Sequence, residues 1–264
     1  MGSLPGALTI VLYLTAAWLA GRAAFDVRDS KAYRWPAVAA VVCHAFSIGL
    51  FMASERGLNF GIFNAASVVA WVTAGSILAT SFRTRIEALS ALLFVLAGVT
   101  VALEILFQTS RVLTDLPPGL LYHIVLALIA YGLFVVACAE AGLLIYADRR
   151  MRAHHPVMHA LPPLAEMERA LFQVLFIAFS LLTYSLILGA LYVTNLSEQH
   201  LYHKVVFAAL AWVVFAVLFF GRWRFGWRGV HAARYVLAGM VLLLLSYFGS
   251  KSVLELILKT PSPA

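Results

Sequence analysis

Four histidines lie within long apolar segments or at the ends of such segments: His44, His123, His200 and His203. A neutral imidazole can ligate haem iron, relay a proton or hydrogen-bond a substrate. A bare imidazole in hydrocarbon is penalised, so each of these side chains needs a partner. A hydrogen bond between two helices is the alternative use for any one of them. The histidines therefore predict polar sites inside an apolar protein and leave the choice among these uses open.

The depths of three of these histidines differ. His44 follows Trp35 by nine residues, about 13 Å at the rise of an α-helix, which places it near the membrane midplane. His123 follows Leu120 by three residues, roughly 4 to 5 Å below the outer surface. His203 opens a later apolar segment at the same outer face. Two histidines at similar depth on different helices favour a shared site for His123 and His203.

Four aromatic residues lie deep in the apolar segments: Trp71, Trp212, Tyr131 and Tyr247. Their rings could line a cavity that holds a planar ligand, and ordinary core packing is the alternative. Two acidic residues, Glu104 and Glu140, lie near segment ends, where we expect them to snorkel or to cap neighbouring helices. No continuous series of carboxylates crosses the membrane, which argues against a proton pump or an ion-coupled transporter.

These residues lie in a chain of 264 residues that is 63% hydrophobic and 12% charged, with a mean hydropathy of +0.92. A soluble domain is roughly 45 to 50% apolar and about 25% charged, so the composition indicates an integral membrane protein. We predict an all-α bundle of eight transmembrane helices that forms a single transmembrane domain over residues 1–264. A β-barrel would show short segments of alternating polarity instead. The expected spans are residues 4–21, 35–54, 60–82, 86–107, 120–146, 170–194, 203–221 and 235–258.

The basic residues divide unevenly between alternate loops. Four Lys or Arg residues follow the first span, two the third, four the fifth and four the seventh, and the remaining five of the 19 fall on the other face. By the positive-inside rule, both termini lie outside the cytoplasm in a bacterial cytoplasmic (inner) membrane. Basic loops beside a lipid bilayer account for the net charge of +7, so no nucleic acid partner is needed.

Two further features carry weaker signals. The polar stretch 148–169 contains His154, His155 and His159, and it is more typical of a basic linker than of a metal site, because no carboxylate or Cys accompanies the histidines at ligand spacing. Neither Cys43 nor Cys138 belongs to a C-x-x-C or a C-x-x-C-H motif. Disulfide exchange and covalent haem attachment are therefore not expected.

Several short motifs resemble the core of the CcsA-type cytochrome c assembly proteins over approximately residues 40–250. The resemblance is greatest to the short YpjD-like branch of that superfamily, which is also similar to HemX. The motifs occur in the same order and at similar spacing as in the family. They are Tyr122-His123-Ile124, Ala130-Tyr131, Leu164 to Arg169, Phe179 to Thr183, Gly189-Ala190, Lys204, Ala211 to Phe215, Gly226 to Gly229, Ala232-Ala233 and Ser246 to Gly249, preceded by His44, Asn64 and Trp71.

The resemblance implies a bundle that handles non-covalent, b-type haem. His123 matches the family's first outer histidine, and His44 matches its early transmembrane histidine. The tryptophan-rich WWD loop of the family is absent, because residues 195–202 contain no Trp. The later membrane histidine of the family falls on Phe220, and its last outer histidine finds only Lys251 and Ser252. His203 stands where the family has a proline, so we infer from position that it is a replacement ligand.

Three hypotheses follow for function. The first is a non-catalytic haem-binding protein related to cytochrome c biogenesis, acting as an assembly accessory, haem relay or regulator. Its candidate iron ligands are His123, His203 and His44, its candidate cavity walls are Trp71, Trp212 and Tyr247, and its partners would be lipid, haem and other cytochrome c assembly or membrane proteins. The second is a small-solute transporter, disfavoured because no inverted repeats are discernible. The third is a scaffold of a membrane complex, with small residues such as Gly189 and Gly239 at helix contacts.

Overall fold

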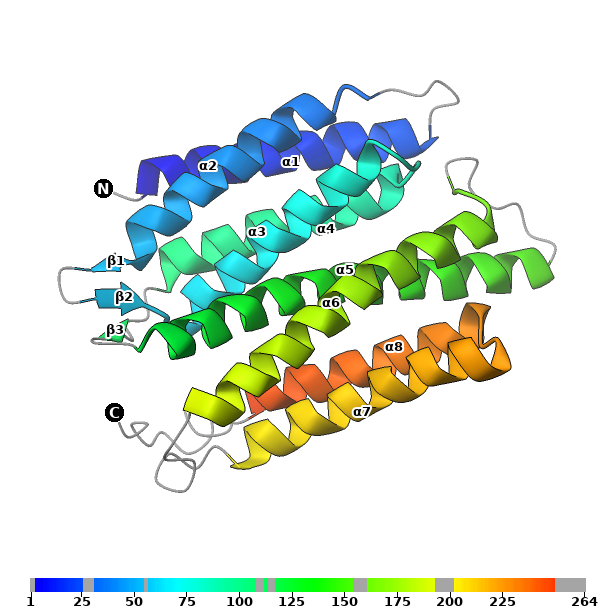
Figure 1. Cartoon of the computed structure of the whole chain (residues 1–264). Coiled ribbons are helices and arrows are strands. Elements are labelled where there is room, and N and C mark those ends of the chain that lie inside the picture. The colour runs from blue at the N-terminus through cyan, green and yellow to red at the C-terminus, as the bar shows by residue number, and fades with distance from the viewer. Residues whose placement is uncertain are drawn as a thin grey trace. The chain divides into compact units, whose positions relative to one another are not determined.

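The computed structural model describes residues 3–25, 31–54, 57–107, 112–113, 117–153, 161–192 and 202–249. Within these residues, eight helices are long and apolar enough to cross a membrane, which confirms the predicted all-α transmembrane architecture (Figure 1). The helices are α1 (Ser3–Phe25), α2 (Arg34–Met52), α3 (Ile62–Ser81), α4 (Glu87–Leu106), α5 (Pro118–Arg152), α6 (Leu164–Tyr192), α7 (Tyr202–Phe225) and α8 (Gly229–Leu244). A short π-helix, η1 (Leu245–Gly249), continues α8. The orientation of the termini stays a prediction.

Several helix ends differ from the expected spans, and the largest differences are at the end of α5 and at the starts of α6 and α8. Helix α8 begins at Gly229, six residues before the expected start at Tyr235. Both Gly226 and Gly229 have positive φ, at 69° and 57°, and these conformations turn the chain sharply after α7. The predicted polar stretch 148–169 is also largely helical at its two ends. An ion pair from Arg152 to Asp148, four residues earlier, supports the last turn of α5.

Three short strands, which the sequence did not predict, form a small antiparallel sheet between helices. Strand β1 (Ala53–Ser54) pairs with β2 (Gly57–Asn59), and β2 pairs with β3 (Val112–Leu113). The amide of Asn64, at the start of α3, donates hydrogen bonds to the carbonyl oxygens of Phe51 and Asn59. This buried side chain therefore fixes the hairpin to the start of α3.

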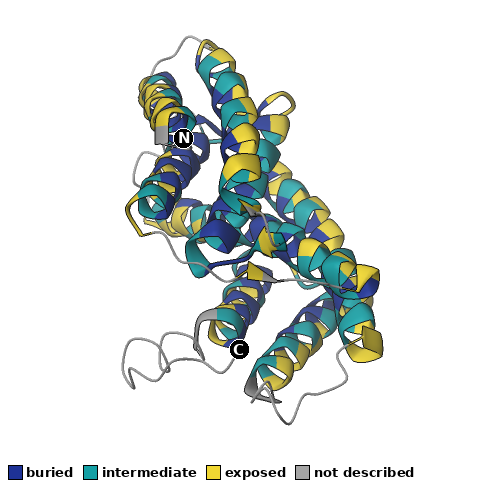
Figure 2. Ribbon diagram, turned by 90° about the vertical axis from the view of Figure 1, so that its left-hand side faces the viewer, coloured by how far each residue is buried: buried dark blue, intermediate teal, exposed yellow. Residues whose placement is uncertain are grey.

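The chain divides into two compact units. Unit 1 comprises Met1–Leu116 and Ala147–Met167, and unit 2 comprises Pro117–Tyr146 and Glu168–Ala264. In unit 1, α1 packs against α2 and α4, while α3 packs against α2 and α4. Small residues let α1 and α4 approach closely, since Ala16 and Ala20 are fully buried and Gly98 lies beside Tyr13. Unit 1 is thus a four-helix bundle whose buried residues line the inner faces of its helices (Figure 2).

Unit 2 is built from most of α5 and α6 together with α7, α8 and η1. Helices α7 and α8 form a close antiparallel pair that continues into η1. Phe215 of α7 is fully buried and stacks on Phe134 of α5, with ring centroids 4.5 Å apart. A Cβ at Gly239 of α8 would lie 2.4 Å from the Phe215 ring, so only glycine admits this ring. The stack joins α5, α7 and α8.

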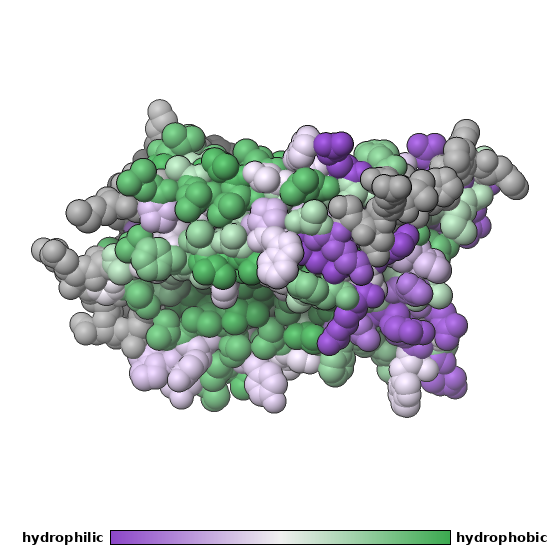
Figure 3. Space-filling model, turned by 90° about the horizontal axis from the view of Figure 1, so that it is seen from above, coloured by the Kyte–Doolittle hydropathy of each residue, from purple (hydrophilic) through white to green (hydrophobic). Residues whose placement is uncertain are grey.

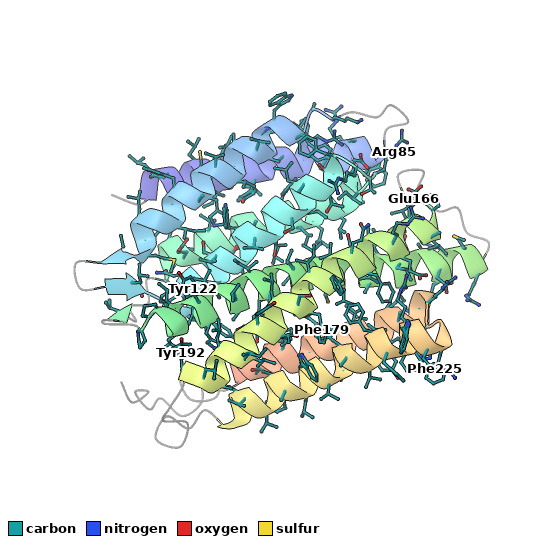
Figure 4. The ribbon with its side chains drawn as sticks, in the orientation of Figure 1. Arg85, Tyr122, Glu166, Phe179, Tyr192 and Phe225 are labelled. Carbon is teal, nitrogen blue, oxygen red and sulfur yellow. The ribbon has the colours of Figure 1, made fainter. Side chains whose placement is uncertain are left out.

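The outer faces of the helices are apolar. Large hydrophobic side chains such as Leu4, Trp35 and Phe46 are 80%, 80% and 65% exposed. Figure 3 shows hydrophobic side chains along most of the visible face and hydrophilic side chains gathered toward one end, the end at which Figure 4 labels Arg85. An apolar exposed band of this kind is what a lipid-facing surface requires.

Candidate functional site

His123 lies in the second turn of α5 and is held by Ser185 of α6. Its Nδ1 is 2.7 Å from the carbonyl oxygen of Ser185 and 3.0 Å from the Ser185 hydroxyl oxygen. The same hydroxyl donates to the carbonyl oxygen of His123, at 3.1 Å. A carbonyl oxygen can only accept, so Nδ1 carries the proton and donates it to Ser185. In the neutral ring, Nε2 therefore presents a bare lone pair.

Gly189 of α6 makes room for the His123 ring. A Cβ at this position would lie 3.0 Å from Cε1 and 3.1 Å from Nδ1 of His123, closer than carbon atoms normally pack. The ring therefore rests against the backbone of α6, one turn beyond Ser185. The hydrogen bond to Ser185 orients the ring, and the contact with Gly189 limits how close it lies to α6. The direction of the Nε2 lone pair is therefore fixed before any ligand binds.

The His123 site lies at the end of unit 2 where α5 begins and α6 ends. Figure 4 places Tyr122 and Tyr192 at this end, while Phe225 lies at the opposite end of the unit. The Tyr192 ring packs directly over Gly119, where an added Cβ would lie 2.3 Å from it. This contact packs the start of α5 against the end of α6 beside the site.

The deep aromatic residues of unit 2 hold helices together through their polar atoms. Trp212 of α7 donates its indole N–H to the Thr183 hydroxyl of α6 at 2.9 Å and stacks on Phe179. The Tyr131 hydroxyl donates to the carbonyl oxygen of Leu243 at 2.9 Å, and its ring lies 5.7 Å from that of Tyr247. The three rings are half-buried. Their role as walls of a ligand cavity stays a prediction.

His203 lies in the first turn of α7, but its side chain is outside the described residues. The neighbouring Lys204 carbonyl oxygen accepts a 2.7 Å hydrogen bond from Ser246 of η1, which fixes the start of α7. The expected pairing of His123 with His203 therefore stays a prediction. His154, His155, His159, His200 and Lys251 also lie outside the described residues.

His44 is in unit 1, at the centre of a buried chain of hydrogen bonds that joins all four helices. Its Nδ1 is 3.0 Å from the Tyr13 hydroxyl of α1, and its Nε2 is 2.9 Å from the Ser67 hydroxyl of α3. Ser67 in turn donates to Oε2 of Glu104 on α4 at 2.7 Å. The side chains of Tyr13, His44 and Ser67 are fully buried, and Glu104 is 1% exposed.

The donor and acceptor groups of these side chains fix the direction of each hydrogen bond in the series. Ser67 uses its single proton on Glu104, so it must accept from the Nε2–H of His44. The unprotonated Nδ1 then accepts from Tyr13. Both ring nitrogens of His44 are therefore engaged, and iron ligation would require the Tyr13 or the Ser67 bond to break. Trp71, in the same unit, donates its indole N–H to the Val41 carbonyl oxygen at 2.9 Å.

The expectation that Glu104 and Glu140 snorkel or cap helices is wrong. Glu104 points into the core of unit 1 toward Ser67, and its Oε1 has no partner among the described residues. Glu140 of α5 is 5% exposed, and neither of its carboxyl oxygens has a partner there. Glu104 lies near the end of α4 and Glu140 lies in the interior of α5, and both are on buried helix faces.

A second polar contact, which the sequence did not reveal, joins three helices at the other end of unit 2. Glu168 of α6 forms an ion pair with Arg222 of α7 at 2.8 Å and accepts the backbone N–H of Gly229 at 3.2 Å. The Arg222 guanidinium also lies 3.5 Å from the centroid of the Phe172 ring. The free N–H at the start of α8 is thereby satisfied by a carboxylate. The motifs around Glu168 and Gly229 were the only signal for it.

The described residues contain no group of three or more His, Cys, Asp and Glu side chains that could hold a metal ion. A metal bound at His123 would therefore have to bring most of its own ligands. Haem does so, because its porphyrin supplies four nitrogens and leaves the axial positions to the protein. A bare Nε2, with Nδ1–H bonded to a backbone carbonyl, is the usual state of a metal-ligating histidine. The donor chemistry at His123 thus fits haem.

Fold and site together define a multi-pass α-helical membrane protein with histidine-centred polar sites. A family model described as Cytochrome C assembly protein matches residues 33–258, and the chain belongs to this family. It is 32% identical over 226 residues to Inner membrane protein YpjD of Escherichia coli strain K12, covering 84% of this chain and 86% of that protein. It is 22% identical over 198 residues to Protein HemX of Brevibacillus brevis, covering 71% and 72%. No solved structure matches the chain.

Proposed function

We propose that this protein binds b-type haem non-covalently in the bacterial inner membrane and serves cytochrome c biogenesis as an assembly accessory, relay or regulator. The observation that carries the proposal is the state of His123, whose Nδ1–H is bonded to Ser185 while Nε2 is bare. The inner-membrane location is supported by the eight spans and by the name of the YpjD relative.

His123 is the residue that would hold haem iron, through its Nε2. When bound, haem supplies an iron centre for ligand or electron chemistry. The residues of this chain bind and orient the group. The Ser185 carbonyl holds the imidazole in the Nε2-ligating tautomer and makes it more basic, and such partners of metal ligands typically matter about 10- to 100-fold in affinity. Gly189 leaves room for the His123 ring beside α6.

His203 is proposed as the second residue that would hold haem, from its position at the start of α7 in the same unit. Two other positions are less suitable. Phe220, where the family carries its later membrane histidine, is 54% exposed on α7 and contacts Trp223 and Phe225. Both nitrogens of His44 are already bonded. Trp212 and Tyr247 are proposed walls for the porphyrin in unit 2. Trp71 is in unit 1, where its indole N–H is bonded to the Val41 carbonyl oxygen, and its role as a cavity wall stays a prediction.

The test is the optical spectrum of the protein purified after expression with haem. Two imidazole ligands predict a sharp Soret band and split visible bands in the reduced state. His123→Ala should abolish or strongly change these bands, and His203→Ala should convert the spectrum to that of a single-imidazole site. His231→Ala is the matched control, because this exposed histidine of α8 packs edge-on against Trp227, near Gly221 rather than near the His123 site. A colourless wild-type protein, or an unchanged spectrum in His123→Ala, would refute the proposal.

A further inference from the structure

The buried hydrogen-bond chain of unit 1 extends from the middle of the bundle toward one end. Tyr13 and His44 lie about ten residues, or roughly 15 Å, from the first residues of α1 and α2. Glu104 lies two residues before the end of α4, roughly 3 Å along the helix. The chain therefore links the centre of the helices to the end of unit 1 where α4 ends.

One oxygen atom in this series of hydrogen bonds has no partner among the described residues. Tyr13, His44 and Ser67 each donate one hydrogen bond and the last two each accept one, so their capacities are matched. The Glu104 carboxyl group accepts from Ser67 at Oε2, while its Oε1 is buried and has no partner among the described residues. An ionised carboxylate in this position would leave half of its charge unsolvated, at a large cost. A proton on Oε1 removes that cost.

No opposite charge in the described part of the bundle offsets Glu104. Helix α3, which packs against α4, contains no titratable side chain. Helix α1 contributes Tyr13 and, near its other end, Arg22. Helix α2 contributes Cys43 and His44, with Arg34 at its far end, where it donates to the Ser81 carbonyl oxygen. On α4 itself, Glu87 lies at the opposite end.

We propose that Glu104 is a proton-binding site, with the Ser67–His44–Tyr13 chain as its internal donor network. A proton from water at the α4 end of unit 1 adds to Oε1. One O–H bond forms, the carboxyl group changes from an anion to a neutral acid, and nothing is oxidised or reduced. Ser67 stabilises the ionised form by donation to Oε2, and burial favours the neutral form, so the two states compete. His44 is here a hydrogen-bond relay between helices, and this role is independent of haem.

The experiment is infrared spectroscopy of the purified, haem-free full-length protein in detergent, titrated in water and in D2O. Wild type should show the C=O stretching band of a protonated, buried carboxyl group that is lost as the pH rises. Glu104→Gln should remove this band at every pH. Glu140→Gln is the matched control, since Glu140 is also a buried carboxyl group but lies in unit 2, and it should leave the Glu104 band in place.

A second variant keeps the carboxyl group and changes only its partner. Ser67→Ala removes the hydroxyl that donates to Oε2, so the carboxyl band should shift to higher frequency and titrate at a different pH. The proposal is overturned if wild type and Glu104→Gln have the same carboxyl bands at every pH. It is equally overturned if the band assigned to Glu104 does not move in Ser67→Ala.

Discussion

Replacement of Gly189 by alanine separates the placement of His123 from the stability of the fold. The new Cβ would lie 3.0 Å from Cε1 and 3.1 Å from Nδ1 of His123. Carbon atoms pack at about 3.5 to 4.0 Å, so the ring must give way by a few tenths of an ångström. Its 2.7 Å hydrogen bond to the Ser185 carbonyl oxygen is then stretched or broken. The Nε2 lone pair loses its fixed direction.

The effect on stability should be small, because two contributions oppose each other. Alanine in a helix interior is favoured over glycine by about 1 kcal/mol. Loss of a hydrogen bond of this kind costs about 1 kcal/mol. We therefore expect a melting temperature within a few degrees of wild type. Loss of a partner that orients a metal ligand typically weakens binding about 10- to 100-fold, and we expect haem affinity to fall by such a factor.

Haem titration and thermal unfolding of the purified variants measure the two quantities. Gly142→Ala is the matched control, since Gly142 lies inside α5 with no atom within 4 Å of an added Cβ. It should gain up to about 1 kcal/mol of stability and bind haem like wild type. If Gly189→Ala binds haem as tightly as Gly142→Ala with an identical spectrum, the geometry assigned to His123 is wrong.

Four further predictions concern the packing of the helices. Glu168→Gln removes the charge that pairs with Arg222 and should destabilise the protein by about 1 to 2 kcal/mol in thermal unfolding, since both side chains are partly buried. Asp148→Asn in unit 1 removes the partner of Arg152, which is 78% exposed, and should leave the melting temperature nearly unchanged. Gly229→Ala forces an alanine into the left-handed region of φ and should lower the unfolding free energy by about 1 to 2 kcal/mol. An unchanged melting temperature would contradict this. Trp212→Phe keeps the stack on Phe179 but loses the indole hydrogen bond to Thr183, so it should lower the unfolding free energy by about 1 kcal/mol. Trp212→Ala loses both contacts and should lower it clearly more. Equal losses in the two variants would contradict the contribution assigned to the stack.

The eight spans could be predicted because length and hydrophobicity determine them locally. The start of α8 could not, since Arg234 is charged and the turn depends on positive φ at Gly226 and Gly229. A charged side chain ends an apolar segment in sequence but not a helix, because it can lie at the interface with its stem along the apolar surface. The same reason explains why α5 runs on to Arg152.

The partners of the histidines could not be predicted, since they lie far away in the chain. His44 bonds to Tyr13 and Ser67, which are 31 and 23 residues distant. His123 bonds to a backbone carbonyl 62 residues away, and a carbonyl group leaves no trace in sequence. Sequence identified His123 and His44 as polar exceptions. Only the packing of helices shows that Nε2 of His123 has no hydrogen-bond partner among the described residues, whereas both ring nitrogens of His44 are bonded.

The length of α5 has a consequence for the membrane surface. Its 35 residues extend about 52 Å, whereas the hydrocarbon core is about 30 Å thick. Even at a tilt of about 40°, the upper end of the usual range, the helix would still measure about 40 Å along the membrane normal. The excess belongs to the end that carries Asp148, Arg149 and Arg152, because charged side chains do not remain in hydrocarbon. A soluble protein that approaches this side therefore contacts the projecting basic end of α5 before it contacts lipid.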